Sequence, residues 1–225
     1  MKISVLLSSY NRPNLIRRAI DSVVKQSHKD FELFVLDDNS ESDIKNVIDS
    51  YNDNRIKFIK FNTTMEDRTS CLMMSKNINS GLEAATGETI SYLADDDYYF
   101  DGWFESVVNY FHSNKEADVV YGKLKYIGCN WKDLFHTQLN QIIGQIDHNQ
   151  LMHRKSVLDK LDKPYWPENL DYFGAPDGFF FKKLFAHFEF HAIDTWAAAK
   201  TQHGHNLLNA QKEYKDGNNS IKTRE

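Results

Sequence analysis

Three consecutive carboxylates, Asp95, Asp96 and Asp97, are the residues of this chain best suited to chemistry. They end a short segment, Thr89 to Leu93, whose β-branched and aromatic residues are typical of a strand. Adjacent acids repel one another unless a cation or a solvated turn absorbs their charge. Mg²⁺ is usually held by one or two carboxylates together with substrate phosphates. The triplet therefore indicates a metal-assisted phosphate site, and a solvated acidic turn is the alternative.

Polar residues follow two other apolar segments in the same way. Ile3 to Leu7 is nearly continuously apolar, as expected for a parallel strand covered on both faces, and Asn11 comes soon after it. Phe31 to Leu36 is a second such segment, followed by Asp37 and Asp38. Ligands of open parallel sheets bind beyond the carboxyl ends of the strands. We therefore expect these side chains to converge with the acidic triplet, and this convergence favours the phosphate site over the turn.

The remaining pattern predicts the elements that position these residues. Strands are expected at Ile3–Leu7, Phe31–Leu36, Arg55–Phe61, Thr89–Leu93, Asp118–Tyr121 and Gln145–His153. Helices are expected from Pro13 to Val24, after a cap at Ser42, at Thr69–Ala85, Trp103–Phe111 and Lys155–Leu161, and from Asp177 to Phe185. Residues 122–145 resemble a loop-rich insertion. Repeated strand–helix–strand units imply an α/β fold with a mostly parallel central sheet and helices on both faces.

Composition narrows the class of protein. The 225 residues are 41% hydrophobic and 26% charged, which is ordinary for a soluble globular protein of one large or two small domains. The net charge of -5 argues against a nucleic-acid partner. Cys71 and Cys129 have neither metal-ligand spacing nor a disulfide framework, so a cytoplasmic location is expected. The apolar start is too short for a signal peptide or a membrane span, which leaves peripheral membrane or spore association open.

The loop after the first expected strand excludes several phosphate-binding folds. Residues Ser8 to Pro13 contain no glycine, whereas a dinucleotide fold or a P-loop needs glycines there so that the backbone can approach phosphate. Phosphoacceptor receiver domains place a lone Asp after the third strand, which this chain does not match. A sugar-phosphate nucleotidyltransferase would need a glycine-rich loop after the first strand, and that loop is absent as well.

Several motifs in a fixed order carry a family resemblance. The chain reads VLLSSYNR at 5–12, FVLDDNS at 34–40 and DDD at 95–97, followed by IDHNQLMHR at 146–154 and GAPDGFFF at 174–181. Together these motifs resemble family 2 glycosyltransferases with the GT-A fold, and within that family the spore-coat polysaccharide enzymes. The likeness covers about residues 2–195. It implies a single domain with a nucleotide-binding half at 1–121, an acceptor-binding half at 122–211 and a disordered tail at 212–225.

The resemblance implies roles on the donor side. The donor would be a UDP- or dTDP-linked sugar, whose base stacks on Tyr10, beside Ser9. Asp38 would accept the N3–H of uracil or thymine, and Arg68 would lie near the base. Asp95 would bind the ribose. Solvated turn or surface positions are the alternatives for Asp38 and Arg68.

The resemblance also implies a metal and a base. Asp96 would bind a Mn²⁺ or Mg²⁺ that bridges the two phosphates, and Asp97 would assist it or cap the following helix. Such a metal stabilises the departing nucleotide diphosphate as a Lewis acid. His205 would be a late metal or phosphate ligand, with a surface histidine as the alternative. Asp177 would deprotonate the acceptor hydroxyl, by analogy with inverting glycoside chemistry, or would only cap its helix.

The acceptor side is less defined. His148 would orient the acceptor or pack against strands, and Trp166 would stack on an acceptor sugar or belong to the core. Relatives often have a further acid or arginine after the catalytic Asp, and here Gly178 follows instead. The sequence thus predicts an inverting, metal-dependent glycosyltransferase acting on a saccharide or other hydroxyl acceptor, in cell-surface or spore-coat polysaccharide synthesis. The alternative is a catalytically weak nucleotide-sugar-binding or scaffold domain of the same fold.

Overall fold

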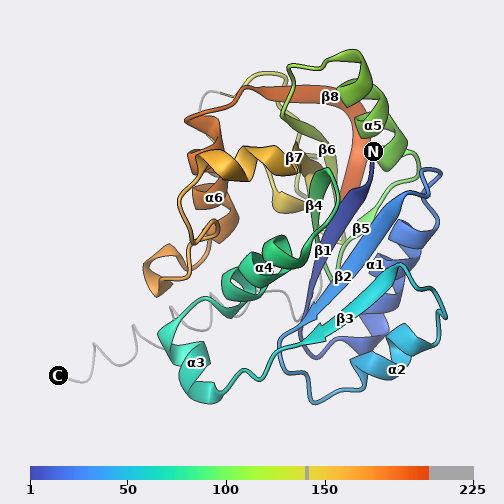
Figure 1. The fold of residues 1–225 in the computed structure, drawn as a ribbon, viewed down its shortest axis with the longest axis vertical. Coiled ribbons are helices and arrows are strands. Elements are labelled where there is room, and N and C mark those ends of the chain that lie inside the picture. Colours follow the sequence, from blue (N-terminus) through green and yellow to red (C-terminus); the bar gives the residue numbers. More distant parts are fainter. Residues whose placement is uncertain (140–141, 203–225) are drawn as a thin grey trace.

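An eight-stranded mixed sheet organises the computed structural model, which describes residues 1–139 and 142–202 (Figure 1). The strand order is β3-β2-β1-β4-β7-β6-β8-β5. The strands are β1 (Ile3–Ser9), β2 (Phe31–Asp37), β3 (Ile56–Lys60), β4 (Thr89–Ala94), β5 (Tyr98–Tyr99), β6 (Val119–Ile127), β7 (Leu151–Arg154) and β8 (Phe190–Thr201). The helices are α1 (Pro13–Val24), α2 (Ile44–Asp49), α3 (Met65–Ser70), α4 (Met73–Ala84), α5 (Trp103–Ser113) and α6 (Pro176–Phe185). Short 3₁₀ turns are η1 (His148–Gln150), η2 (Lys155–Lys160) and η3 (Leu170–Tyr172).

The first four long strands form the parallel part of the sheet. β1 pairs in parallel with β2 on one side and with β4 on the other, and β2 pairs in parallel with β3. Ser9 at the end of β1 is in register with Asp37 at the end of β2. The α/β class and the mixed sheet with flanking helices are confirmed, and the carboxyl ends of β1, β2 and β4 lie at one edge.

The second half of the sheet differs from the prediction. β7 runs antiparallel between β4 and β6, and β8 runs parallel to β6. The predicted strand Gln145–His153 is wrong in its first part, because Asp147 accepts from the N–H of Asn149 and starts the turn η1. β6 extends to Ile127 into the segment expected to be a loop. β8 was not predicted at all.

Helix boundaries differ at two positions. The predicted helix over Thr69–Ala85 is two helices, because Cys71 adopts an extended backbone and the N–H of Leu72 donates to the Glu168 carbonyl at 2.7 Å. Asp43 rather than Ser42 caps α2, since its carboxylate accepts from the N–H at the third helical position.

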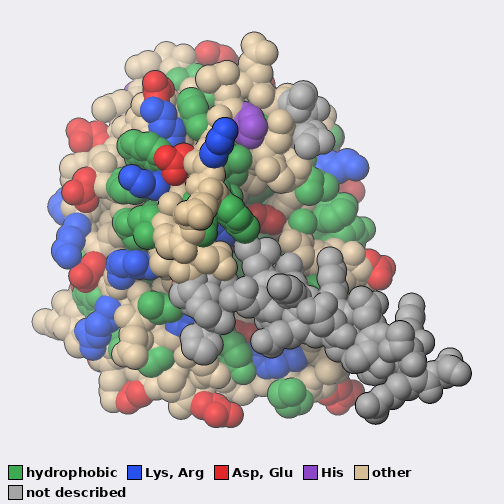
Figure 2. All heavy atoms as spheres, turned by 180° about the vertical axis from the view of Figure 1, so that it is seen from behind, with side chains coloured by type: hydrophobic (Ala, Val, Ile, Leu, Met, Phe, Trp, Pro, Cys, Tyr) green, Lys and Arg blue, Asp and Glu red, His purple; other side chains and the backbone are tan. Residues whose placement is uncertain are grey.

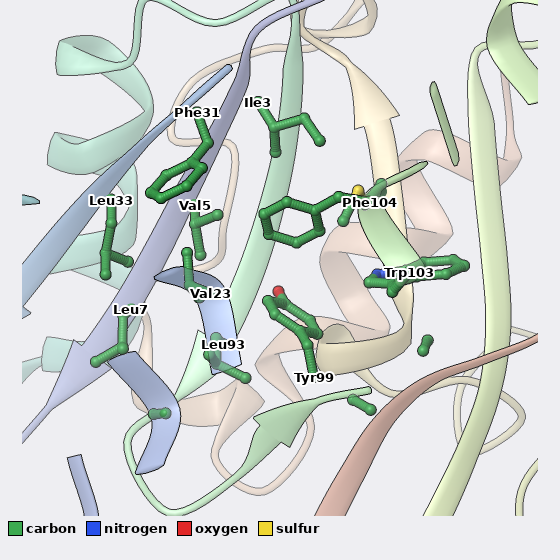
Figure 3. Packing of buried hydrophobic residues seen from close by; sticks show 14 of the residues in the cluster. Ile3, Val5, Leu7, Val23, Phe31, Leu33, Leu93, Tyr99, Trp103 and Phe104 are labelled. Carbon is green, nitrogen blue, oxygen red and sulfur yellow. The ribbon is translucent and has the colours of Figure 1, made fainter. Parts of the chain in front are cut away.

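Two apolar layers cover the sheet, one on each face. Neighbouring strand residues point to opposite faces, so Val5 and Leu7 belong to one cluster while Leu6 belongs to the other. Figure 3 shows the first cluster, in which Val5 and Leu7 lie on the same side as Phe104 of α5. The second cluster contains residues of α4 and α6, so both helices are anchored to the strands that end at the predicted site.

The surface gives two further observations. Acidic and basic side chains are intermixed on the face shown in Figure 2, as is usual for a solvated surface. In the described ranges, no helix combines the length and the apolar character that crossing a bilayer requires. The predicted tail at 212–225 lies outside the described residues.

Candidate active site

Backbone contacts at the carboxyl ends of β1, β2 and β4 bring the first predicted site residues together. The N–H of Tyr10 donates to Asp95 Oδ2 at 3.1 Å. The N–H of Asp38 donates to the Ser9 carbonyl at 2.9 Å, and the N–H of Asp95 donates to the Ser8 carbonyl at 3.2 Å. The residues that directly follow β2 and β4 are therefore held against the end of β1. Residues from three separate sequence segments meet as expected.

Asp38 lies at the centre of a polar cluster suited to a nucleobase. Its carboxylate accepts from Arg68 Nη1 and Thr63 Oγ1, and from Asn77 Nδ2 at 3.3 Å. The Arg68 guanidinium lies over the Tyr10 ring, with Cζ 4.2 Å from the ring centroid. Tyr10 is 45% exposed, so its ring also offers surface to a ligand. This arrangement favours Asp38 over its buried neighbour as the group that faces a base.

Asp37 and Ser9 have different environments from Asp38. Asp37 is buried, and its carboxylate accepts from the Ser40 hydroxyl and from the Ser40 N–H at 3.2 Å. Asp37 therefore shapes the loop after β2. The hydroxyl of Ser9 is buried and has no hydrogen-bond partner within the described part of the chain.

Arg12 joins the first two carboxylates of the triplet. Its Nη1 lies 2.8 Å from Asp95 Oδ1 and 3.1 Å from Asp96 Oδ2. Asp95 is 2% exposed and Asp96 is 7% exposed, and burial raises the pKa of Asp95 to about 6 although Arg12 opposes this rise. Burial lowers the pKa of Arg12, but attraction to Asp95 and then to Asp96 raises it more, so that it exceeds its usual value. The two acids thus form a largely buried, negatively charged site that already holds the Arg12 guanidinium.

Asp97 faces protein donors instead. It accepts from Asn149 Nδ2 at 2.8 Å and from the N–H of Thr201 at 2.7 Å. Burial, and then the nearby charge of Asp96, raise the pKa of Asp97 to about 7. The alternative prediction that Asp97 caps the following helix is wrong, because Gly102 occupies the cap of α5. Asp97 ties the end of β4 to η1 and β8, and its assistance to a metal stays a prediction.

A second charged cluster is formed by residues from the second half of the chain. Nδ1 of His148 is 3.6 Å from Asp147 Oδ1 and 3.6 Å from Asp177 Oδ2. Lys200 of β8 forms an ion pair with Asp147. Burial alone would lower the pKa of His148, but the charges of Asp147 and Asp177 raise it above its ordinary value. One ligand atom from each of these two acids and His148 would fit around a cation, although the Lys200 ammonium already supplies positive charge there.

The side-chain amide of Asn149 connects the two clusters. Its Nδ2 donates to Asp97 Oδ2 at 2.8 Å and to Asp147 Oδ1 at 2.7 Å, while its Oδ1 accepts from the N–H of Ala94 at 3.0 Å. Asn149 is fully buried, so this position is fixed by packing as well as by hydrogen bonds. The acidic triplet and the cluster around Asp177 therefore belong to one connected site.

Aromatic packing places α6, which carries Asp177. Trp166 stacks on Phe180 of α6 at a centroid distance of 5.2 Å, and both rings contact Tyr92 of β4. Trp166 has no exposed surface, so it belongs to the core and the prediction that it stacks on an acceptor sugar is wrong for this structure. The N-cap of α6 is Ala175, which makes Asp177 a first-turn residue rather than the cap.

Asp177 is partly exposed at the start of α6. Its side chain is 22% exposed, so the carboxylate is reachable by a ligand while one edge faces His148. Its Oδ1 also accepts from the N–H of Gly178 at 2.9 Å. His205, the remaining predicted ligand, lies outside the described residues.

Four residues of this site escaped the sequence interpretation, although each lies near a motif. They are Arg12, Asp147, Asn149 and Lys200. Arg12 comes two residues after Tyr10 in one motif, and Asp147 and Asn149 flank His148 in another. Lys200 is a charged residue at the end of an apolar alanine segment, a position that ordinarily demands a partner.

The chain belongs to a family of sugar-transferring enzymes. The model of that family, Glycosyl transferase family 2, matches residues 4–187. Among curated relatives, Protein CgeD of Bacillus subtilis (strain 168) is 33% identical over 195 residues, which cover 81% of this chain and 46% of CgeD. This chain therefore spans less than half the length of that relative.

Solved structures share the fold. TarS 1–349 of S. aureus, in complex with UDP-GlcNAc, has a TM-score of 0.73 at 21% identity, covering 93% of this chain and 61% of that chain. The mannosyltransferase PcManGT of Pyrobaculum calidifontis, in complex with GDP-Man and Mn²⁺, has a TM-score of 0.65 at 13% identity, covering 91% and 58%. At these identities the likeness establishes the fold, which is that of GT-A glycosyltransferases.

Proposed function

We propose that this chain transfers a sugar from a UDP- or dTDP-linked donor to a hydroxyl group of a saccharide or other acceptor, with inversion and with the help of a divalent metal. The observation that carries this proposal is the amide of Asn149, which donates to Asp97 and to Asp147 at once. It joins the strand ends suited to a nucleotide diphosphate to the cluster that contains Asp177. A donor site and a candidate base thus lie in one connected arrangement.

The donor side is supported by the chemistry of Asp38 and Arg68. Uracil and thymine both present an N3–H, for which the Asp38 carboxylate is a strong acceptor. Arg68 already contacts that carboxylate and lies over the Tyr10 ring. The three side chains thus form a surface for a base, with the Asp38 carboxylate as its hydrogen-bond acceptor. The UDP-GlcNAc complex of TarS, which shares the fold, is consistent with such a donor.

We assign the metal to Asp96, as the resemblance implies, and also to Asp95, for which the resemblance implies ribose binding; Asp97, the other implied ligand, accepts from Asn149 and Thr201. Carboxylate oxygens are the ligands that Mg²⁺ and Mn²⁺ favour, and the Arg12 guanidinium between Asp95 and Asp96 acts as a stand-in cation that shows the site accepting positive charge. A bound Mn²⁺ or Mg²⁺ would supply Lewis-acid stabilisation of the departing diphosphate. A role for His205 at this site remains part of the sequence prediction.

Asp177 is proposed as the base. Its carboxylate takes the proton of the acceptor hydroxyl as that oxygen bonds to the anomeric carbon and the bond from the same carbon to the phosphate oxygen breaks. The electron pair of the broken bond leaves with the nucleotide diphosphate. His148, 3.6 Å from Asp177 Oδ2, sets the orientation of that carboxylate. The cytoplasm as location, and cell-surface or spore-coat polysaccharide as product, complete the proposal.

Two substitutions test the assignment. Asp177→Asn should keep Mn²⁺-dependent UDP binding in calorimetry but lose sugar transfer and the slow hydrolysis of the donor. Asp171→Asn, which alters an exposed acid shortly before α6, is the matched control and should keep both activities. Undiminished transfer by Asp177→Asn would remove Asp177 as the base.

The second candidate function is a nucleotide-sugar-binding or scaffold domain. Wild-type protein that binds UDP with Mn²⁺ but turns over no member of a panel of UDP- and dTDP-hexoses, with simple saccharides as acceptors, would favour that function. Asp38→Asn separates donor recognition from either outcome. It should weaken binding of UDP about tenfold or more, because a charge-assisted hydrogen bond to the base is lost.

A further inference from the structure

We propose that Arg12 is the resident cation of the carboxylate pair Asp95–Asp96, and that it exchanges these carboxylates for the diphosphate when metal and donor bind. The inference rests on the proposed function, because it concerns the same two acids. It assigns to Arg12 a role that goes beyond holding the loop after β1.

The geometry of the contact supports an exchange. One nitrogen atom, Nη1 of Arg12, lies within 3.1 Å of an oxygen of each carboxylate. Mg²⁺ is generally held at about 2.0–2.1 Å from its oxygen ligands, so a metal that these two carboxylates held would need the space next to the oxygens that Nη1 contacts. The two cations cannot share that space, and their charges repel each other. Binding of a metal by both acids therefore requires the guanidinium to leave at least one of them.

Burial explains why a resident cation is needed. Asp95 and Asp96 are adjacent and largely buried. Burial removes much of the hydration of each carboxylate, and their negative charges repel each other. Arg12 offsets that repulsion in the metal-free protein.

The position of Arg12 allows the side chain to move without the backbone. Arg12 is the N-cap residue of α1, with Pro13 fixing the first turn behind it, and its side chain is 24% exposed. Rotation about its side-chain bonds moves the guanidinium while α1 stays packed on the sheet. The guanidinium would then face the diphosphate, for which its planar donor pairs are well matched.

This exchange has a thermodynamic consequence. Metal alone must displace Arg12 and gives the guanidinium no new partner, whereas metal together with a nucleotide diphosphate supplies one. Metal and nucleotide should therefore bind cooperatively in the wild type. Removal of the Arg12 charge should strengthen the binding of metal alone and weaken the binding of nucleotide, which reduces that cooperativity.

The experiment measures equilibrium binding and needs no turnover. Mn²⁺ binding without nucleotide is followed by electron paramagnetic resonance, and UDP binding at saturating Mn²⁺ by calorimetry, for wild type, Arg12→Gln and Arg12→Lys. The matched control is Arg17→Gln, which removes the same charge from an exposed arginine of α1 whose Nη1 donates to Ser50 Oγ at 3.3 Å. Circular dichroism confirms folding of each variant.

For Arg12→Gln we expect Mn²⁺ alone to bind about tenfold more tightly and UDP with Mn²⁺ about tenfold more weakly, the scale of one charge-assisted contact. Arg12→Lys should lie between Arg12→Gln and wild type, since an ammonium cannot reproduce the planar fork. If Arg12→Gln does not fold, Arg12→Lys provides the test. Arg17→Gln should follow the wild type.

Two results would overturn the inference. The first is Mn²⁺ affinity in the Arg12 variants equal to or below that of Arg17→Gln, while wild type binds UDP with Mn²⁺; this rejects the exchange and keeps the donor site. The second is wild-type protein that binds no UDP with Mn²⁺, which rejects the proposed function and the exchange together.

Discussion

His153 offers a quantitative test of how the core beneath α6 is built. Its ring is fully buried, with Nδ1 2.8 Å from the Arg154 carbonyl and Nε2 2.8 Å from the Tyr92 hydroxyl. Because a carbonyl only accepts, Nδ1 carries the hydrogen and Nε2 accepts from Tyr92. A proton on Nε2 would oppose the tyrosine hydrogen in a fully buried site. Burial accordingly lowers the pKa of His153 from 6.5 to about 4.

This lowered pKa makes the free energy of unfolding depend on pH. Below pH 6.5 the unfolded chain takes up a proton that the folded chain refuses, so stability falls as the pH falls toward 4. The full difference in pKa corresponds to about 3 kcal/mol, of which about 2 kcal/mol is lost by pH 5. The stabilisation is complete only above pH 6.5.

Urea unfolding at several pH values between 7 and 5 measures this loss. His153→Gln stays neutral throughout, so its stability should fall by about 2 kcal/mol less than that of the wild type over this range. It will be less stable at pH 7, but the change with pH is the quantity compared. His112→Gln, which replaces an exposed histidine of α5, should follow the wild-type curve. Parallel curves for wild type and His153→Gln would refute the reasoning.

Two further predictions concern buried ion pairs. Lys200→Met should destabilise the protein by about 3 kcal/mol in urea unfolding, because Asp147 is left as an uncompensated buried charge, and Asp147→Asn added to it should recover part of that loss. Burial alone would raise the pKa of Glu32, but hydrogen bonds from Lys2 and Lys57 lower it below 4.5. The stabilisation of the folded protein by these contacts is therefore present above pH 4.5 and is lost as the pH falls below it. The free energies of unfolding of Glu32→Gln and wild type should therefore converge as the pH is lowered.

The sequence predicted the parallel half of the sheet because its strands are buried on both faces. Such strands are continuous apolar runs, and Ile3–Leu7, Phe31–Leu36 and Thr89–Leu93 each lie inside an observed strand. β8 contains three consecutive buried alanines, which have little intrinsic preference for a strand. β5 has two residues and exists only because it pairs with β8. β5 and β8 both depend on tertiary contacts, which the local spacing of apolar residues does not reveal.

The residues of the site also fall into those that the sequence predicted and those that it did not. Asp38, Asp95 and Asp177 could be proposed from motifs and strand ends. Their partners are distant in the chain: Arg12 is 83 residues from Asp95 and Lys200 is 53 residues from Asp147. Periodicity reports which face a residue occupies but not which distant residue stands opposite, so these partners required the fold.

The position of β8 late in the chain determines when its contacts with the buried acids can form during synthesis. The parallel strands β1 to β4 can pair once residue 94 has left the ribosome, yet Lys200 and Thr201, which hold Asp147 and Asp97, emerge more than a hundred residues later. A stalled nascent chain that stops short of β8 would hold its acids at the right strand ends without their donors. The hydrogen bond to Asp97 and the ion pair with Asp147 therefore form only after β8 has been synthesised.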